Sequence, residues 1–159
     1  MKAREFCSRV VVTAEPSTDL REAAHLMRDS HVGALIVVER TGGISRPVGI
    51  VTDRDIVVGV VAAPGVRPEA LTVRDVMSAE LATVGENDGV FEAVEAMRDR
   101  GARRLPVVSE DGKLVGILSL DDLLRVISAE LAGLSDALRT STAREVHERR
   151  ALEDAAQPI

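Results

Sequence analysis

Residues 49–56 read GIVTDRDI and residues 116–123 read GILSLDDL, so one pattern occurs twice in the chain. Each stretch has a glycine, two aliphatic residues, a hydroxyl residue, two variable positions, an aspartate and a further aliphatic residue. A serine or threonine followed three residues later by an acid is typical of the capping box at the start of a helix. A helix that starts directly after a strand also presents free N–H groups, which favour phosphate. For the stretch alone, both interpretations, cap and ligand site, stay open.

The glycine that opens each stretch allows a close neighbour. Gly49 and Gly116 have no side chain, so another backbone segment or a ligand can approach the chain there. The sequence does not say which of the two comes close.

The surrounding sequence is a tandem repeat. Residues 3–38 align with residues 73–108 at an offset of 70, and from the quoted stretch onward the offset is 67. The first copy therefore carries three extra residues, which lie within ERTGGISRP at 39–47. Glycine and proline mark this segment as a surface turn, where an insertion costs little free energy.

Each copy predicts the same five elements, namely a short strand, an amphipathic helix, two strands joined in a hairpin, and a second helix. In the first copy the expected strands are 9–14, 33–38 and 47–52, and the expected helices are about 18–30 and 53–61. In the second copy the expected strands are 81–84, 103–108 and 114–119, and the last helix is about 120–132. The first helix of each copy has an apolar face with a spacing of three and four residues: Leu20, Ala23, Ala24 and Met27, and Val90, Ala93, Val94 and Met97.

These elements predict an α+β fold of two pseudo-symmetric β-α-β-β-α repeats that pack together through their sheets, followed by a C-terminal helical extension. Each repeat alone is too small to bury a good core, so we expect the two to pack on each other. The predicted boundaries are 1–62 for the first repeat, 63–72 for the linker, 73–132 for the second repeat and 133–159 for the helical tail.

The order, spacing and duplication of these elements resemble a tandem pair of CBS (cystathionine-β-synthase) domains, also called a Bateman module, over about residues 3–130. The resemblance implies that adenosine-type ligands bind in clefts between the two repeats. It also implies that the aspartate of each motif holds the ribose and that the serine or threonine holds the phosphate or the sugar. Carried over by position, Thr52 with Asp55 form the first site, and Ser119 with Asp122 form the second site.

The resemblance implies further residues that line the two sites. They lie two positions before the hydroxyl residue, at the start of the middle strand and in the first strand of each copy, and each site is expected to combine its motif with the first strand of the other repeat. These residues are Ile50, Val32, Gly33, Ala34 and Val12 in the first copy, and Ile117, Ala102, Arg103, Arg104 and Ala82 in the second copy.

The two copies differ in charge at the start of the middle strand. The second copy reads ARRLPVV there, with Arg103 and Arg104, whereas the first copy reads VGALIVV. Because arginine is well suited to hold phosphate oxygens, the second site is our choice for a di- or triphosphate or a dinucleotide, although a solvated surface arginine is the alternative. The first site should prefer a less charged adenosine ligand or stay empty. Arg54 either adds a positive charge to it or points to solvent.

Composition argues against several other classes of protein. The net charge of −6 and an aromatic content of 1% argue against nucleic acid as a partner. No apolar run approaches the roughly 20 residues that span a bilayer, so we expect a cytoplasmic protein without a membrane partner. The three histidines have no metal-binding spacing, and no nucleophile–base pair is evident, so we expect neither a metal nor an enzyme. Cys7 aligns with Met77 and is most simply an apolar filler.

The C-terminal tail begins with an apolar seam. The seam has a spacing of three and four residues and comprises Leu124, Ile127, Leu131, Leu134 and Leu138. It either folds back on its own core or packs on a partner subunit, and the resemblance implies a homodimer. From Arg139 onward the tail is polar and charged, which favours a loosely held helix.

The hypothesis that follows is a stand-alone regulatory protein. It would bind adenosine-containing ligands of the AMP, ADP, ATP, NAD or S-adenosylmethionine class as regulators, require no other cofactor, and signal to an unidentified protein effector by a conformational or oligomeric change. The alternative is a constitutive dimeric interaction module whose clefts are vestigial and do not respond to ligands.

Overall fold

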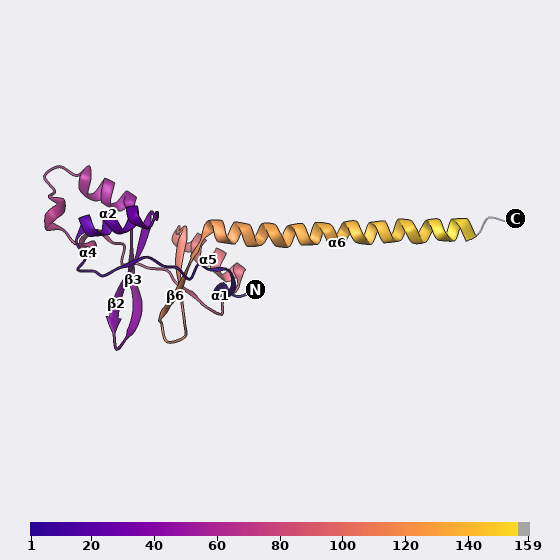
Figure 1. The fold of residues 1–159 in the computed structure, drawn as a ribbon, viewed down its shortest axis with the longest axis horizontal. Coiled ribbons are helices and arrows are strands. Elements are labelled where there is room, and N and C mark those ends of the chain that lie inside the picture. The colour runs from indigo at the N-terminus through magenta and orange to yellow at the C-terminus, as the bar shows by residue number, and fades with distance from the viewer. Residues whose placement is uncertain (156–159) are drawn as a thin grey trace. The chain divides into compact units, whose positions relative to one another are not determined.

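The computed structural model describes the backbone of residues 1–155 and the side chains of residues 1–149. It contains two three-stranded sheets of the same topology (Figure 1). In each sheet the first strand runs parallel to the second, and the second runs antiparallel to the third. The first sheet comprises β1 (Thr13–Ala14), β2 (Ala34–Thr41) and β3 (Ile44–Thr52), and the second comprises β4 (Val84–Gly85), β5 (Arg104–Val108) and β6 (Leu114–Ser119).

Helices complete the predicted β-α-β-β-α order in both repeats. The first repeat has α2 (Leu20–Asp29) and α3 (Asp53–Ile56), and α3 continues as a π-helical segment, η1 (Val57–Val61). The second repeat has α5 (Val90–Arg100) and α6 (Leu120–Ala155). Three short segments precede the repeats: α1 (Ala3–Phe6), the 3-10 turn η2 (Pro68–Ala70) and α4 (Val73–Val76). The predicted α+β fold of two repeats with a C-terminal helix is confirmed.

The core of the first repeat lies between α2 and its sheet. Leu20, Ala23 and Met27 of α2 are buried together with Leu35 and Val51 of the strands. The prediction for Ala24 was wrong, because this residue is exposed. The buried positions follow a spacing of three and four along one narrow stripe, and Ala24 lies beside that stripe rather than on it.

The first strands are shorter than predicted. Of the predicted strand 9–14 only Thr13 and Ala14 form β1, and of the predicted strand 81–84 only Val84 lies in β4, which ends one residue later at Gly85. The apolar residues ahead of them, such as Val10 and Leu81, lie outside the sheets because the chain passes there from one repeat to the other.

The three extra residues of the first copy lengthen its hairpin. Strands β2 and β3 are joined by Gly42 and Gly43, both exposed and with φ of 60° and 80°. These angles suit glycine and the tight turns that match strand twist. The sheets remain otherwise equivalent, since the register shifts at Val37/Val38 in one and at Val107/Val108 in the other.

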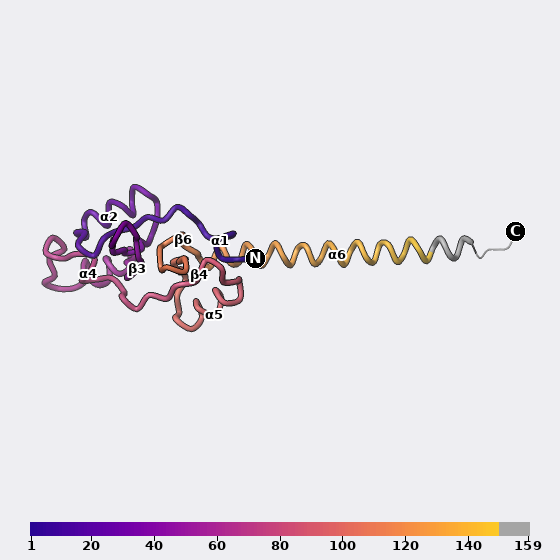
Figure 2. Tube along the Cα trace, turned by 90° about the horizontal axis from the view of Figure 1, so that it is seen from below, coloured from indigo at the N-terminus to yellow at the C-terminus, as the bar shows by residue number. Residues whose placement is uncertain are grey.

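The short segments in front of the repeats are exchanged between them. The backbone N–H of Ala3 in α1 donates to the carbonyl of Asp88 in the second repeat, at 2.7 Å. The N–H of Val73 in α4 donates to the carbonyl of Thr18 in the first repeat, at 2.8 Å, and Val73 is fully buried in the first core. Figures 1 and 2 show the indigo N-terminal segment starting beside β6 and continuing to α2.

The chain divides into two compact units, one ending at Asp122 and one formed by the following residues. Helix α6 continues without a break across the predicted boundary between residues 132 and 133. Along it, Leu131, Leu134 and Leu138 of the apolar seam are 61%, 64% and 70% exposed. Among residues 1–155, no helix combines the length and apolar character that a bilayer span requires.

Candidate functional site

The first repeated stretch is a capping box in the structure. The backbone N–H and the Oγ1 hydroxyl of Thr52 donate to Oδ2 of Asp55, at 2.8 and 2.7 Å. In return, the N–H of Asp55 donates to Oγ1 of Thr52 at 3.2 Å. These bonds satisfy the free N–H groups at the start of α3 and fix the half-buried Asp55 carboxylate beside the end of β3. The capping interpretation of the stretch is confirmed.

The second stretch repeats this geometry at the start of α6. The N–H and Oγ of Ser119 donate to Oδ2 of Asp122, at 2.9 and 2.5 Å. The N–H of Asp122 donates to Oγ of Ser119 at 3.2 Å. Both carboxylates therefore use the same oxygen, Oδ2, for the cap.

The residues predicted at the start of each middle strand lie next to these caps. Thr52 pairs with Ala34 across β2 and β3, and the N–H of Asp53 donates to the carbonyl of Gly33 at 3.1 Å. In the second repeat, Ser119 pairs with Arg104. There the N–H of Leu120 donates to the carbonyl of Arg103, at 3.0 Å. The structure thus brings the predicted residues of each motif and of each middle strand together within one repeat.

Gly49, the glycine of the first stretch, leaves room for a backbone segment that passes close to it. Ile50 and Ser78 exchange two backbone hydrogen bonds, of 3.1 and 2.9 Å. A Cβ atom on Gly49 would lie 2.8 Å from Sδ of Met77 and 3.0 Å from the carbonyl oxygen of Ser78. The segment that leads from α4 to β4 therefore crosses directly over Gly49.

The second stretch meets the equivalent segment from α1. Ser8 and Ile117 exchange two backbone hydrogen bonds of 2.9 Å. A Cβ on Gly116 would lie 2.6 Å from Sγ of Cys7 and 2.9 Å from the carbonyl oxygen of Ser8. Cys7 occupies the position that Met77 has in the other repeat, which agrees with its interpretation as an apolar filler. Burial raises the pKa of its thiol, so the reactive thiolate is disfavoured.

The first-strand residues predicted to line the sites, Val12 and Ala82, are half-buried, and Val12 packs against the core of its own repeat. The carbonyl of Val12 accepts a hydrogen bond from the N–H of Ile36 in β2, at 3.2 Å. At the equivalent place in the second repeat Pro106 has no N–H, so Ala82 cannot accept such a bond. Contact with the opposite motif is made by the residues ahead of these strands, Ser8 and Ser78.

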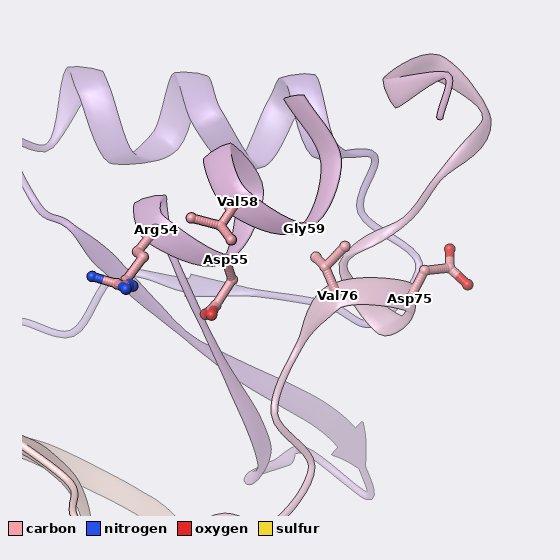
Figure 3. Close-up of a pocket in the computed structure, with 6 residues that line it drawn as sticks. All are labelled: Arg54, Asp55, Val58, Gly59, Asp75 and Val76. Atoms are coloured by element: carbon pink, nitrogen blue, oxygen red, sulfur yellow. The ribbon is translucent and has the colours of Figure 1, made fainter. Parts of the chain in front are cut away.

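A pocket of about 370 Å³ adjoins the first site, and sequence reasoning missed most of its lining (Figure 3). It is lined by Asp55 and Arg54 of α3, Val58 and Gly59 of η1, and Asp75 and Val76 of α4. Figure 3 shows the Asp75 carboxylate pointing away from the space beside Asp55. Hydrogen bonds from Thr72 hold the pKa of Asp75 below its usual value, with the backbone N–H contributing more than the hydroxyl. No sequence signal indicated that α4 would lie against the first repeat.

The arginines that are predicted to hold phosphate are accessible to solvent. Arg103 and Arg104 are exposed at the start of β5, beside the cap of the second site. Arg54, whose role the sequence left open, is exposed and lines the pocket at the first site. Among the residues that the structure describes, no three His, Cys, Asp or Glu side chains gather in a metal-binding group.

Comparisons with known proteins agree with the repeat. The sequence model of the CBS domain matches residues 3–61 and again residues 73–129. The CBS domain-containing protein YhcV of Bacillus subtilis is 37% identical to this chain over 138 residues, which are 86% of this chain and 92% of YhcV.

Solved structures show the same fold. The hexameric CBS-CP12 protein from bloom-forming cyanobacteria is similar at a TM-score of 0.66 and 28% identity, over 91% of this chain and 88% of that one. The cytosolic domain of the Mg²⁺ channel MgtE in complex with ATP is similar at a TM-score of 0.66 and 25% identity. That similarity covers 79% of this chain and 48% of that one.

Proposed function

This chain belongs to the CBS domain family, and on that premise we propose that it is a regulatory protein that binds adenosine-containing ligands at its two motif sites. Binding shifts a conformational or oligomeric equilibrium, which a protein effector reads. The protein catalyses no reaction and acts in the cytoplasm.

The observation that carries this proposal is the capped aspartate that occurs in both repeats. At the first site, the cap bonds end on Oδ2 of Asp55, which leaves Oδ1 to accept hydrogen bonds from ribose hydroxyls. Ile50, Val32 and Ala34, with Val12, supply apolar surface for a purine, and Ile117, Ala102 and Ala82 do so in the second repeat. The MgtE domain, which has the same fold, was solved in complex with ATP, and this supports an adenine nucleotide as the ligand class.

The second site is the better place for a polyphosphate. Arg103 and Arg104 lie beside Ser119 at the start of a long helix, and both the guanidinium groups and the helix start favour phosphate oxygens. The first site has no arginine at the equivalent positions, Gly33 and Ala34, and takes a less charged adenosine ligand.

Thermal melts with AMP, ADP, ATP, NAD and S-adenosylmethionine test the proposal. A ligand at 100 times its dissociation constant should stabilise the protein by about 2.7 kcal/mol. The variant Asp122→Ala should lose the response to ATP. Asp75→Ala is the matched control, because it removes the same kind of cap from α4 and leaves the second site intact. If no adenosine ligand raises the melting temperature, or if Asp122→Ala responds like the wild type, the proposal fails.

A second candidate function, a constitutive interaction module, is favoured by one observation. The seam residues Leu131, Leu134 and Leu138 are largely exposed, which suits burial against a second copy of the chain. The CBS-CP12 protein, whose similarity covers 91% of this chain, was solved as a hexamer. We propose a homodimer for this chain under either function.

Sedimentation tests the homodimer, and the melts then separate the two functions. The wild type should sediment as a dimer, and Leu131→Ser with Leu134→Ser should shift the equilibrium towards a monomer. A dimer that forms normally but responds to no ligand in the melts would favour the constitutive module over the regulator.

A further inference from the structure

Two pairs of equivalent positions differ in charge between the repeats. Gly33 is equivalent to Arg103, and Asp53 is equivalent to Leu120. The backbone is the same at both places, because the N–H of Asp53 donates to the carbonyl of Gly33 at 3.1 Å and that of Leu120 donates to the carbonyl of Arg103 at 3.0 Å. The two sites therefore differ here in side chains and not in backbone geometry.

The Asp53 carboxylate lies over the glycine where the second repeat has a guanidinium. Its Oδ2 is 3.1 Å from the position of a Cβ on Gly33, and its Oδ1 accepts a hydrogen bond from the N–H of Arg54 at 2.7 Å. The carboxylate is held beside the cap of Thr52 and Asp55. A negative charge thus occupies the place beside the first site that Arg103 occupies beside the second.

Arg54, the next residue, is exposed and lines the pocket at the same site, and Figure 3 shows its side chain extending away from that of Asp55.

We infer that Asp53 makes the first site select against phosphate and for neutral or cationic adenosyl compounds, such as a sulfonium nucleoside. This inference rests on the proposed function and assigns a specificity residue to one of its sites. Like charges close together repel, whereas a sulfonium or ammonium group is attracted to the same carboxylate. One chain would then sense two adenosyl compounds of different charge.

Calorimetric titration of an Asp122→Ala background, in which the second site is disabled, isolates the first site. The probes are S-adenosylmethionine, which is cationic, 5′-methylthioadenosine, which is neutral, and AMP. Adding Asp53→Asn, which keeps the size and removes the charge, should weaken S-adenosylmethionine about tenfold and strengthen AMP by a similar factor, since it removes one nearby charge. The affinity for methylthioadenosine should stay the same. Asp99→Asn, an exposed charge change on α5, is the matched control and should alter none of the three.

The outcomes separate this inference from the proposed function. Equal changes for all three probes in Asp53→Asn, or no change, would overturn the inference. In that case the proposed function would still stand if the wild-type chain binds ATP and the single variant Arg103→Gln binds it more weakly. A chain that binds none of the probes and no ATP overturns both.

Discussion

At the scale of the residue, the two repeats solve the same backbone problem with different side chains. His31 follows α2 with a φ of 54°, and Gly101 follows α5 at the equivalent position with a φ of 59°. Both residues end a helix in the left-handed conformation, which glycine adopts without the steric cost that a Cβ imposes. The first repeat therefore holds a strained residue where the second does not.

Replacing His31 by glycine should stabilise the protein. We expect the free energy of unfolding of His31→Gly to rise by about 0.5–1 kcal/mol, because relief of the left-handed strain exceeds the entropy that glycine adds to the unfolded chain. Urea denaturation measures the change. The reciprocal variant Gly101→His should lose about 1 kcal/mol, and a loss of stability in His31→Gly would contradict the explanation.

At the scale of the element, the same cap starts three helices, and only two of them begin at the proposed ligand sites. Thr72 and Asp75 form at α4 the bonds that Thr52 and Asp55 form at α3. The N–H and hydroxyl of Thr72 donate to Oδ2 of Asp75 at 2.8 and 2.9 Å. The TVRD of α4 shows that a Thr-x-x-Asp motif by itself indicates a helix start, and that the surrounding repeat is what indicates a ligand site.

The α4 cap predicts a pH dependence. Asp75 should titrate below its usual value of about 3.8, because the N–H and the hydroxyl of Thr72 stabilise its charged form. A depressed pKa contributes stability that is present above the usual value and is lost as the pH falls through the folded-state value. Carboxyl NMR titration should show Thr72→Val moving the pKa of Asp75 part of the way back, since the backbone bond remains. In the chain unfolded by urea, the pKa of the same carboxyl should be about 3.9.

At the scale of the whole molecule, exchanged segments join the two repeats. The chain after α1 crosses β6 at Gly116, and the chain after α4 crosses β3 at Gly49. Each crossing places a sulfur atom and a carbonyl oxygen where a side chain would otherwise lie. The repeats are therefore interlocked, because each sheet is crossed by a backbone segment that leads into the other repeat.

Filling one crossing should weaken the whole molecule. We expect Gly116→Ala to lower the free energy of unfolding by about 1–3 kcal/mol, because its Cβ would lie 2.6 Å from Sγ of Cys7. Adding Cys7→Ala should recover part of the loss, which a double-mutant cycle in urea would show. Gly59→Ala is the matched control, since nothing lies within 4 Å of a Cβ there. Equal effects of Gly116→Ala and Gly59→Ala would contradict the interlocked crossing.

Much of the fold and of the sites follows from local pattern. The repeated cap, the helix stripe with Leu20 and Met27, and the glycine turn at 42–43 are all set by residues within a few positions of one another, and such patterns can be read directly. The extent of the first strands could not be read, because the apolar residues from Val10 to Val12 suit a strand equally well whether or not a neighbour pairs with them.

The sequence by itself determined the duplicated β-α-β-β-α order, the two caps and the unequal arginines of the two copies. Only the tertiary structure decided that α1 packs on the second repeat and α4 on the first, that backbone segments cross Gly49 and Gly116, and that Asp53 lies over Gly33. These contacts join residues far apart in the chain or depend on how a side chain turns. Their geometry is set by the packing of the two repeats on each other, which no local pattern encodes.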